Sequence, residues 1–259
     1  MLTDFDKTLY INQTLITIQG EGKFLGTPCL LMRFSFCNLV CDFCDTKYSW
    51  KESNIQTSIN NENFAVYKEK LKEIIKEKNI KHLMITGGEP LLYANNKLFP
   101  KLINEINDWD NVEIETNGTL LDNALYALLN INSKISINIS PKLDIECYKD
   151  KKIHAFDLEI LDRFERHFDV TFKFVHDVES ERKILYFIKN YVFERQNASA
   201  MALTPDINKF KDMDLFFKEF DLRNQETLQF CINNTIRFSP RLHYSLFGKN
   251  KEEFKSIDI

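Results

Sequence analysis

The sequence predicts an α/β fold, a partial parallel (β/α)6 barrel with an N-terminal strand or hairpin and a C-terminal helical or loop extension. Short apolar runs rich in β-branched and aromatic residues alternate with longer amphipathic runs along the 259 residues. This is the pattern of parallel strands joined by crossover helices. Six such units can be read, fewer than the eight of a closed barrel. No repeat, linker or low-complexity stretch divides the chain, so we expect a single domain over residues 1–259.

The expected strands are apolar and bounded by polar or turn residues, as buried parallel strands are. A strand or hairpin at residues 14–18 precedes the barrel. The barrel strands are expected at residues 30–36, 82–86, 112–116, 135–139, 170–175 and 200–203. Between the strands, apolar residues recur at the helical period of about 3.6 residues, most clearly at residues 64–78, 177–191 and 210–220.

Composition excludes several classes of protein. Apolar residues at 44 % and charged residues at 28 % are ordinary for a globular chain, and no apolar stretch approaches the ~18 residues of a membrane span. The net charge is −4 without a basic block or a basic-then-apolar leader, so we expect no direct binding of nucleic acid and no signal peptide. Six cysteines, three of them clustered, suit a reducing cytoplasm better than a disulfide framework.

Glycine is scarce and concentrated. The chain has seven glycines, where average usage of ~7 % gives roughly eighteen. Five of them fall in two short segments, as Gly20, Gly22 and Gly26 and then Gly87 and Gly88. A chain this sparing of glycine places it where the backbone turns sharply or closely approaches a ligand. These segments are therefore candidates for a functional site.

The polar motifs follow strands of the expected barrel. A cysteine run comes after the first barrel strand, and the segments 87–90, 115–118 and 140–142 follow the next three. In such a barrel the chemistry belongs at the carboxyl ends of the strands. We therefore expect these segments to form one site.

The cysteine run is Cys37, Cys41 and Cys44, with the spacing C-x-x-x-C-x-x-C. Structural zinc takes four protein ligands, whereas a cubane iron–sulfur cluster held by three thiolates leaves one iron open for a substrate. A zinc site with a distant fourth ligand stays open as an alternative, although the nearest downstream histidine is His82. Free cysteines bury readily, so the remaining three are read as small core or near-surface residues: Cys29, Cys147 and Cys231.

The cysteine spacing, followed by Gly87-Gly88-Glu89-Pro90, resembles the radical S-adenosylmethionine superfamily. The resemblance implies a barrel of that superfamily's type and a [4Fe-4S] cluster. It also implies S-adenosyl-L-methionine, bound to the open iron through its amino and carboxylate groups. Reduction of the cluster then cleaves the sulfonium to a 5′-deoxyadenosyl radical.

A narrower resemblance runs nearly from end to end. The segments 18–22, 44–50, 140–142 and 239–243, together with Gly26, Arg33 and the pair Phe247-Gly248, are similar to the 7-carboxy-7-deazaguanine synthase family. That family converts 6-carboxy-5,6,7,8-tetrahydropterin to 7-carboxy-7-deazaguanine with loss of ammonia, using Mg2+ and regenerating S-adenosylmethionine. The resemblance therefore implies a carbon–nitrogen lyase of queuosine-type 7-deazapurine biosynthesis, a tRNA modification pathway. It further implies a homodimer reduced by flavodoxin or ferredoxin.

The same resemblance assigns roles to individual residues. Cys37, Cys41 and Cys44 would ligate the cluster, and the Thr46 hydroxyl would bind Mg2+, a hard cation that prefers oxygen. The substrate-binding set is Ile18, Gln19, Gly20, Glu21, Arg33, Thr86 and His243. The set lining the S-adenosylmethionine pocket is Phe43, Asp45, Gly87, Gly88, Glu89, Thr116, Ser140, Pro141 and Lys142. The candidates for catalytic proton transfer are Glu21, Glu115 and His243.

Three positions depart from the family pattern. Phe36 stands where glycine is common, Val40 where a basic residue is usual, and Phe43 where tryptophan is frequent. Two other readings also stay open. One is an activase of the same superfamily that abstracts hydrogen from a glycine of a partner protein, and the other is a non-catalytic iron–sulfur or zinc protein. The activase does not call for Thr46 as a metal ligand or for the segments 19–21 and 239–243. An iron–sulfur carrier normally closes its cluster with four cysteines, and neither a carrier nor a zinc-bound interaction protein needs a six-unit barrel.

Overall fold

A nine-stranded sheet forms the centre of the computed structural model, which describes residues 4–150, 152, 156–205 and 212–247. The strand order is β3-β1-β2-β4-β5-β6-β7-β8-β9. Strand β1 pairs antiparallel with β2 and β3, and every pair from β2 to β9 is parallel. The strands are β1 (Leu9–Ile18), β2 (Pro28–Phe34), β3 (Thr57–Ile59), β4 (His82–Gly87), β5 (Asn111–Thr116), β6 (Ile135–Ile139), β7 (Asp169–His176), β8 (Ala198–Ala202) and β9 (Arg237–Phe238).

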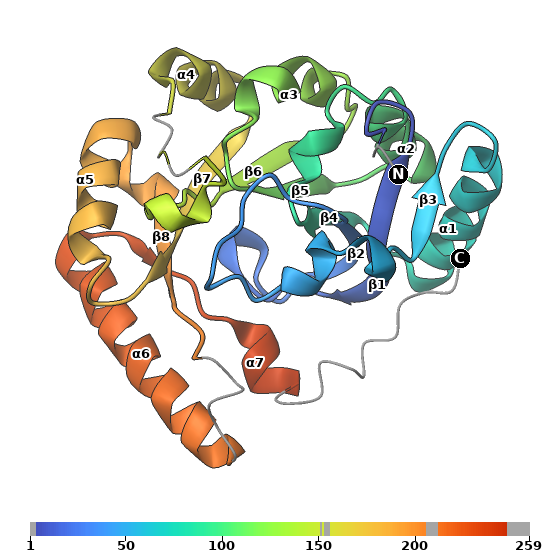
Figure 1. Cartoon of the computed structure of the whole chain (residues 1–259). Coiled ribbons are helices and arrows are strands. Elements are labelled where there is room, and N and C mark those ends of the chain that lie inside the picture. The colour runs from blue at the N-terminus through green and yellow to red at the C-terminus, as the bar shows by residue number, and fades with distance from the viewer. Residues whose placement is uncertain (1–3, 151, 153–155, 206–211, 248–259) are drawn as a thin grey trace.

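Helices cover the outside of this curved sheet. Figure 1 shows α1 to α5 arranged around it, α6 along the side next to β8, and α7 between α6 and the β1/β2 hairpin. The helices are α1 (Phe64–Lys78), α2 (Leu98–Ile106), α3 (Leu121–Leu129), α4 (Leu158–His167), α5 (Glu181–Tyr191), α6 (Met213–Asn234) and α7 (Leu242–Phe247). Because β3 and β9 are the two edges of the sheet and do not pair with each other, the barrel is open, and the predicted partial barrel is confirmed. Within the described residues, no helix is both long enough and apolar enough to cross a membrane.

The six barrel strands predicted from the sequence are confirmed as β2 and β4 to β8. Strand β2 ends at Phe34 and not at residue 36, because the chain turns away there. The edge strands β3 and β9 are not predicted, since three and two residues are too short to show a period. Strand β1 is longer than expected and forms a hairpin with β2.

Two helices differ from their expected bounds. Helix α5 begins at Glu181 and not at residue 177, because Asp177 and Ser180 form a turn in which the Ser180 backbone N–H donates to Asp177 Oδ1. Helix α6 continues past residue 220 to Asn234. Exposed apolar residues on its outer face, such as Leu222 and Ile232, hide the amphipathic pattern there. The expected start of this helix, residue 210, lies outside the described residues.

The alternation of side chains along each strand separates two environments. On β5, Val112 and Ile114 are buried among the apolar residues of the core, whereas Glu113 and Glu115 belong to a polar network inside the barrel. Asn138 on β6 joins that network through hydrogen bonds to both carboxylates. The barrel interior is therefore polar, and it is enclosed by an apolar layer of strands and helices.

Phe36 adopts a backbone conformation that is rare for residues with a side chain. Its φ is +69°, in the left-handed region that costs an L-residue about 1–2 kcal/mol. Its ring packs edge-on against Phe5 and Tyr10, with centroids 5.6 Å away in both cases. The glycine that the family commonly has at this position avoids the backbone cost, and in this chain aromatic packing offsets it.

We predict that Phe36→Ala destabilises the protein more than Phe36→Gly does. Both variants lose the ring contacts, but alanine keeps the left-handed strain, so glycine should be more stable by about 1 kcal/mol. Urea unfolding of the two variants and the parent protein under the same anaerobic conditions measures the difference. An alanine variant at least as stable as the glycine variant would show that the backbone at residue 36 is not strained.

Candidate active site

A cavity of about 350 Å³ opens at the carboxyl ends of the barrel strands, within the size range of small-molecule sites. It brings together most of the residues that the sequence singles out. Those that line it are Ile18, Gln19, Gly20, Glu21, Arg33, Cys37, Cys41, Phe43, Cys44, Asp45, Thr46, Thr86, Gly87, Gly88, Glu115, Thr116, Ser140, Lys142 and His243. Two of the expected residues, Glu89 and Pro141, are absent from its wall.

The cysteine loop is held in place by the segment that follows β6. Leu39 forms an antiparallel bridge with Tyr148, and the Val40 backbone N–H donates to the Cys147 carbonyl at 2.8 Å. Cys41 packs against buried Cys147, and half-buried Cys37 and Cys44 lie beside this pair. Cys147, which the sequence suggests is a small core residue, is thus buried against the cysteine loop.

Two of the loop thiols, those of Cys37 and Cys41, have raised pKa values. Burial raises the pKa of Cys37 to about 11, with Glu89 adding to the effect. The pKa of Cys41 is raised first by its hydrogen bond with Cys147 and then by burial. These thiols therefore hold their protons at neutral pH until a cation replaces them, as metal ligands do on binding.

The spacing of possible ligands separates two kinds of metal site. Within the described part of the chain, no three Cys, His, Asp or Glu side chains converge closely enough to hold a single metal ion. A mononuclear zinc site requires such convergence, whereas each thiolate of a [4Fe-4S] cluster binds a different iron atom. Three cysteines from one loop match the number of thiolates that holds a cubane cluster with one open iron, whereas the zinc alternative still requires a distant fourth ligand.

The two glycines at the end of β4, Gly87 and Gly88, are required by the cysteine loop. The Gly88 backbone N–H donates to the Phe34 carbonyl at 3.0 Å, and the Glu89 N–H donates to the Phe36 carbonyl at 2.8 Å. A Cβ on Gly88 would stand 1.8 Å from the Phe36 oxygen, and one on Gly87 would stand 2.2 Å from the Phe34 oxygen. The glycines therefore let the chain approach its own backbone, in addition to lining the cavity.

Glu89 fixes, from inside the protein, the turn that Gly87 and Gly88 form at the end of β4 (the Gly87–Gly88 corner). Its buried carboxylate accepts hydrogen bonds from the Thr116 hydroxyl and the Asn117 N–H, both at 2.7 Å, and from the Leu91 N–H at 3.0 Å. Burial raises its pKa against these hydrogen bonds. Glu89 thus joins the end of β4 to the end of β5 and has the geometry of a positioning residue.

The N-terminal and C-terminal motifs meet on the other side of the cavity. The Gly22 N–H donates to Ser239 Oγ, and the Leu242 N–H donates to the Gly20 carbonyl, both at 2.8 Å. Gly20 is so close to His243 that an added Cβ would stand 2.6 Å from the imidazole Nδ1. Segments at opposite ends of the sequence therefore form one wall of the cavity.

The Gln19 side chain makes its hydrogen bonds within the protein. Its amide Nε2 donates to Glu113, and its Oε1 accepts the Glu21 N–H. The backbone N–H and carbonyl of Gln19 pair with the loop at Thr27 and Gly26. Gln19 therefore serves to position the segment that carries Glu21.

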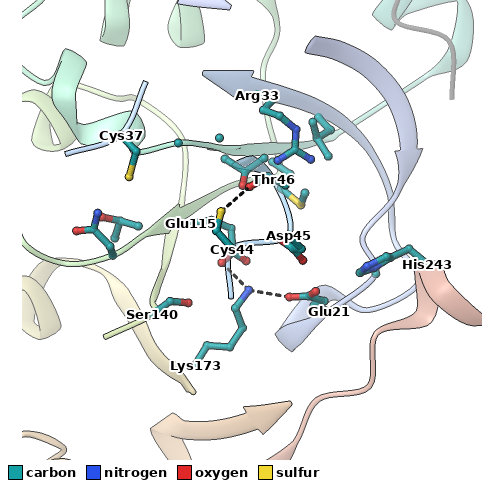
Figure 2. A pocket seen from close by; sticks show the side chains of 18 of the residues that line it. Glu21, Arg33, Cys37, Cys44, Asp45, Thr46, Glu115, Ser140, Lys173 and His243 are labelled. Carbon is teal, nitrogen blue, oxygen red and sulfur yellow. Dashed lines mark hydrogen bonds and ion pairs between the residues drawn. The ribbon is translucent and has the colours of Figure 1, made fainter. Parts of the chain in front are cut away.

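Arg33 and Thr46 lie on the same side of the cavity, as Figure 2 shows. The Arg33 guanidinium stands over the Tyr48 ring at 5.7 Å and reaches Gln13 Oε1 at 3.5 Å. In the described residues no carboxylate is within ion-pair distance of it, so its fork remains available for an anionic ligand. The Thr46 hydroxyl stands 3.5 Å from Cys44 Sγ.

Two cations at the site are missed by the sequence reasoning. Lys173 Nζ donates to Glu115 at 2.5 Å and to Glu21 at 3.0 Å, as the dashed lines of Figure 2 mark. Arg241 Nη1 donates to Asp45 at 3.2 Å, and its Nε stands 3.6 Å from Glu21. The sequence feature that could have indicated Lys173 is a lysine between two phenylalanines in a predicted barrel strand.

Comparisons with known proteins agree with this geometry. A family model described as "Radical SAM superfamily" matches residues 31–155. A protein of Buchnera aphidicola subsp. Schizaphis graminum named 7-carboxy-7-deazaguanine synthase is 31 % identical over 250 residues, covering 90 % of this chain and 95 % of that protein. The chain belongs to the 7-carboxy-7-deazaguanine synthase family.

Other comparisons extend this result. The Halobacterium salinarum protein of the same name is 26 % identical over 254 residues, covering 94 % of this chain and 92 % of that protein. The crystal structure of QueE from Escherichia coli matches with a TM-score of 0.56 at 19 % identity, over 91 % of this chain and 95 % of that chain. The structural match supports the fold, and the family membership disfavours the activase and non-catalytic alternatives.

The departures from the 7-carboxy-7-deazaguanine synthase pattern are accommodated locally. Val40 contributes its backbone N–H to the loop, a contact that does not depend on its side chain. Phe43 is 38 % exposed at the cavity, with the Lys142 ammonium 6.0 Å from its ring centroid. The Phe247-Gly248 motif ends outside the described residues, because Gly248 is not among them.

We predict that Gly88→Ala costs about 3 kcal/mol or more of stability, because its Cβ would overlap a carbonyl oxygen. Gly26→Ala is the matched control: Gly26 has φ +83° but open space around it, so only the left-handed strain of about 1 kcal/mol applies. Denaturant unfolding of both variants measures the difference. Equal costs for the two variants would show that the approach of β4 to the cysteine loop is not tight.

Proposed function

We propose that this protein converts 6-carboxy-5,6,7,8-tetrahydropterin to 7-carboxy-7-deazaguanine with release of ammonia, as a radical S-adenosylmethionine lyase. One observation carries the proposal: a single cavity joins the cysteine loop and the Gly87–Gly88 corner to the segments around Glu21 and His243. The name of the Buchnera relative, which aligns over nearly the whole chain, supports the reaction. The product would enter 7-deazapurine biosynthesis of the queuosine type.

The residues present fit a [4Fe-4S] cluster with S-adenosyl-L-methionine. Cys37, Cys41 and Cys44 would hold the cluster from one loop that borders the cavity. When bound and reduced, this group supplies a 5′-deoxyadenosyl radical that starts the ring contraction. Ser140 and Lys142 lie on the adjoining wall, where they would bind the polar ends of S-adenosylmethionine. Gly87 and Gly88 at the end of β4 keep this wall close to the cysteine loop.

Arg33 would bind the substrate carboxylate. Its guanidinium faces the cavity without a carboxylate partner among the described residues, and an arginine fork matches a carboxylate with two parallel hydrogen bonds. The Thr46 hydroxyl, which also lines the cavity, would bind Mg2+ together with substrate oxygens. The cation would then fix the orientation of the same carboxylate.

Release of ammonia requires that a proton reach the departing nitrogen. Of the two candidate carboxylates, Glu115 is better suited to carry that proton, because burial raises its pKa while Lys173 opposes the shift. Burial also acts to raise the pKa of Glu21, but Lys173, Arg241 and His243 hold it well below the usual value. Glu21 therefore stays ionised and suits binding better than proton donation.

The proposal extends to the surroundings of the reaction. Flavodoxin or ferredoxin would supply the electron, the protein would act in the cytoplasm as a homodimer, and no direct contact with nucleic acid is needed. Sedimentation of the cluster-loaded protein tests the dimer. Turnover with each of the two electron carriers in place of a chemical reductant tests the partner.

We predict that the anaerobically reconstituted and reduced protein forms 7-carboxy-7-deazaguanine from S-adenosylmethionine, Mg2+ and 6-carboxytetrahydropterin. Mass spectrometry detects the product, and Cys41→Ala should abolish it, because the loop then retains only two thiolates. Cys231→Ala, which alters a buried cysteine of α6 away from the cavity, is the matched control and should keep activity. Formation of 5′-deoxyadenosine without the deazaguanine would keep the superfamily chemistry and refute the substrate.

We predict that Thr46→Val lowers kcat/KM about tenfold or more at the Mg2+ concentration that saturates the parent protein. A methyl group then replaces the proposed oxygen ligand. Thr46→Ser keeps the hydroxyl and should retain most of the activity. Titration of the rate with Mg2+ in the parent protein and in both variants measures the effect. A valine variant with an unchanged Mg2+ dependence would remove Thr46 from the metal site.

A further inference from the structure

Lys173 is the most constrained charged group in the barrel interior. Its side chain is 5 % exposed, and its ammonium lies between Glu115 Oε2 at 2.5 Å and Glu21 Oε2 at 3.0 Å. It comes from β7, whereas Glu115 comes from β5 and Glu21 from the loop after β1. One ammonium therefore fixes carboxylates from two distant parts of the chain against the same cavity.

Glu21 is held from a second side by Arg241, whose Nε stands 3.6 Å from Oε1. Its ionised carboxylate is a pure acceptor with about four lone-pair sites. Lys173 and Arg241 occupy only part of this capacity. Because Glu21 lines the cavity, the remaining lone pairs can accept hydrogen bonds from a ligand there.

We propose that Lys173 is a positioning residue that, with Arg241, aims the Glu21 carboxylate at the edge of the pterin ring formed by its 2-amino group and N3–H. This inference rests on the proposed function. The two N–H groups are adjacent on the pyrimidinone ring, so one carboxylate can accept both in parallel, as it does from the fork of an arginine. A ring with oxygen in place of the 2-amino group would lose one of these bonds and turn an acceptor toward the carboxylate.

The polarity of the cavity matches the two ends of the substrate. Arg33 lies on β2 and Lys173 on β7, with β4, β5 and β6 between them in the sheet. Figure 2 shows Arg33 and Thr46 on one side and Lys173 with Glu21 on the other. A pterin carrying its carboxylate at C6 has an anionic end and, across the fused ring, an N–H donor edge. Binding the carboxylate at Arg33 therefore directs the donor edge toward Glu21.

Lys173 itself is unsuited to proton transfer or to direct binding of this edge. Burial acts to lower the pKa of Lys173, but Glu115 and Glu21 raise it above the usual lysine value. The ammonium thus stays charged, has no lone pair, and directs hydrogens to two carboxylates. Lys173 therefore influences binding of the donor edge by orienting the Glu21 carboxylate.

The test compares binding of 6-carboxypterin and 6-carboxylumazine, in which oxygen replaces the 2-amino group, to the cluster-loaded protein. Quenching of ligand fluorescence gives each Kd. The parent protein should prefer the pterin about thirtyfold or more, because buried acceptors reject a ligand that lacks the matching donor. Lys173→Met and Glu21→Gln should reduce the preference below about threefold, while Lys173→Arg retains most of it.

Lys23→Met is the charge-matched control. Lys23 lies in the same loop as Glu21 but is half-exposed and pairs with Asp169, so its loss should leave the preference unchanged. If Lys173→Met does not fold, Glu21→Gln and Lys173→Arg carry the test, since both preserve side-chain volume closely. Turnover supplies a second readout: Glu21→Gln should raise KM at least about tenfold with little change in kcat, as expected when binding is lost equally in ground and transition states.

Four outcomes would overturn the proposal. A Lys173→Met protein that keeps the pterin preference shows that Lys173 has only a structural role. A fall in kcat without a change in KM in Glu21→Gln shows that Glu21 acts in the chemical step and not in binding. A parent protein that forms 7-carboxy-7-deazaguanine but binds both ligands equally refutes the Glu21 subsite alone. A parent protein that neither binds the pterin nor forms the product refutes the proposed function as well.

Discussion

Charged groups can be buried inside this barrel only where ion pairs or hydrogen bonds compensate them, and the rest of the site depends on that requirement. An isolated buried charge is costly, and removing one member of a buried pair leaves the other uncompensated. At the cavity wall, Lys173 pairs with Glu21 and Glu115, and Arg241 pairs with Asp45. These residues come from the loop after β1, from β5 and β7, from the cysteine loop and from the C-terminal segment. The pairing therefore draws the two ends of the chain onto the strands and completes a cavity that the barrel alone would leave open.

A second constraint is steric and sets the position of the cysteine loop. The end of β4 approaches that loop so closely that only glycine fits at residues 87 and 88, while Phe36 accepts a left-handed conformation to complete the turn. Glu89 then joins the end of β4 to the end of β5 through two hydrogen bonds, from Thr116 and Asn117. The thiols thus stand on a loop whose path is fixed by backbone contacts. A cluster bound there would meet a site formed before it arrives.

The sequence predicts those parts of the structure that depend on interactions between residues close together along the chain. Barrel strands and the first helix are local patterns of period 2 and 3.6, so they can be read directly. The cysteine loop and the glycine corner are contiguous motifs, and their common location follows from parallel-strand topology. Lys173 and Arg241 could not be placed in this way, because their partners lie up to 196 residues away along the chain. The position of Cys147 against Cys41 likewise depends on a long-range bridge.

The same distinction explains why motif residues differ in what they do. Gln19 and Glu89 belong to the motifs that carry the family resemblance, yet their side chains are used within the protein, on Glu113 and on the β5 turn respectively. Arg33 keeps its guanidinium for the cavity. A motif thus indicates which residues the site needs but not whether each one contacts a ligand or positions a neighbour that does.

Burial and hydrogen-bond capacity decide between these two roles. A side chain whose donors and acceptors are already used inside the protein can only position others. By this criterion the cavity has an arginine available at one side and a constrained carboxylate at the other, and a ligand with an anionic group and an N–H donor edge can satisfy both at once.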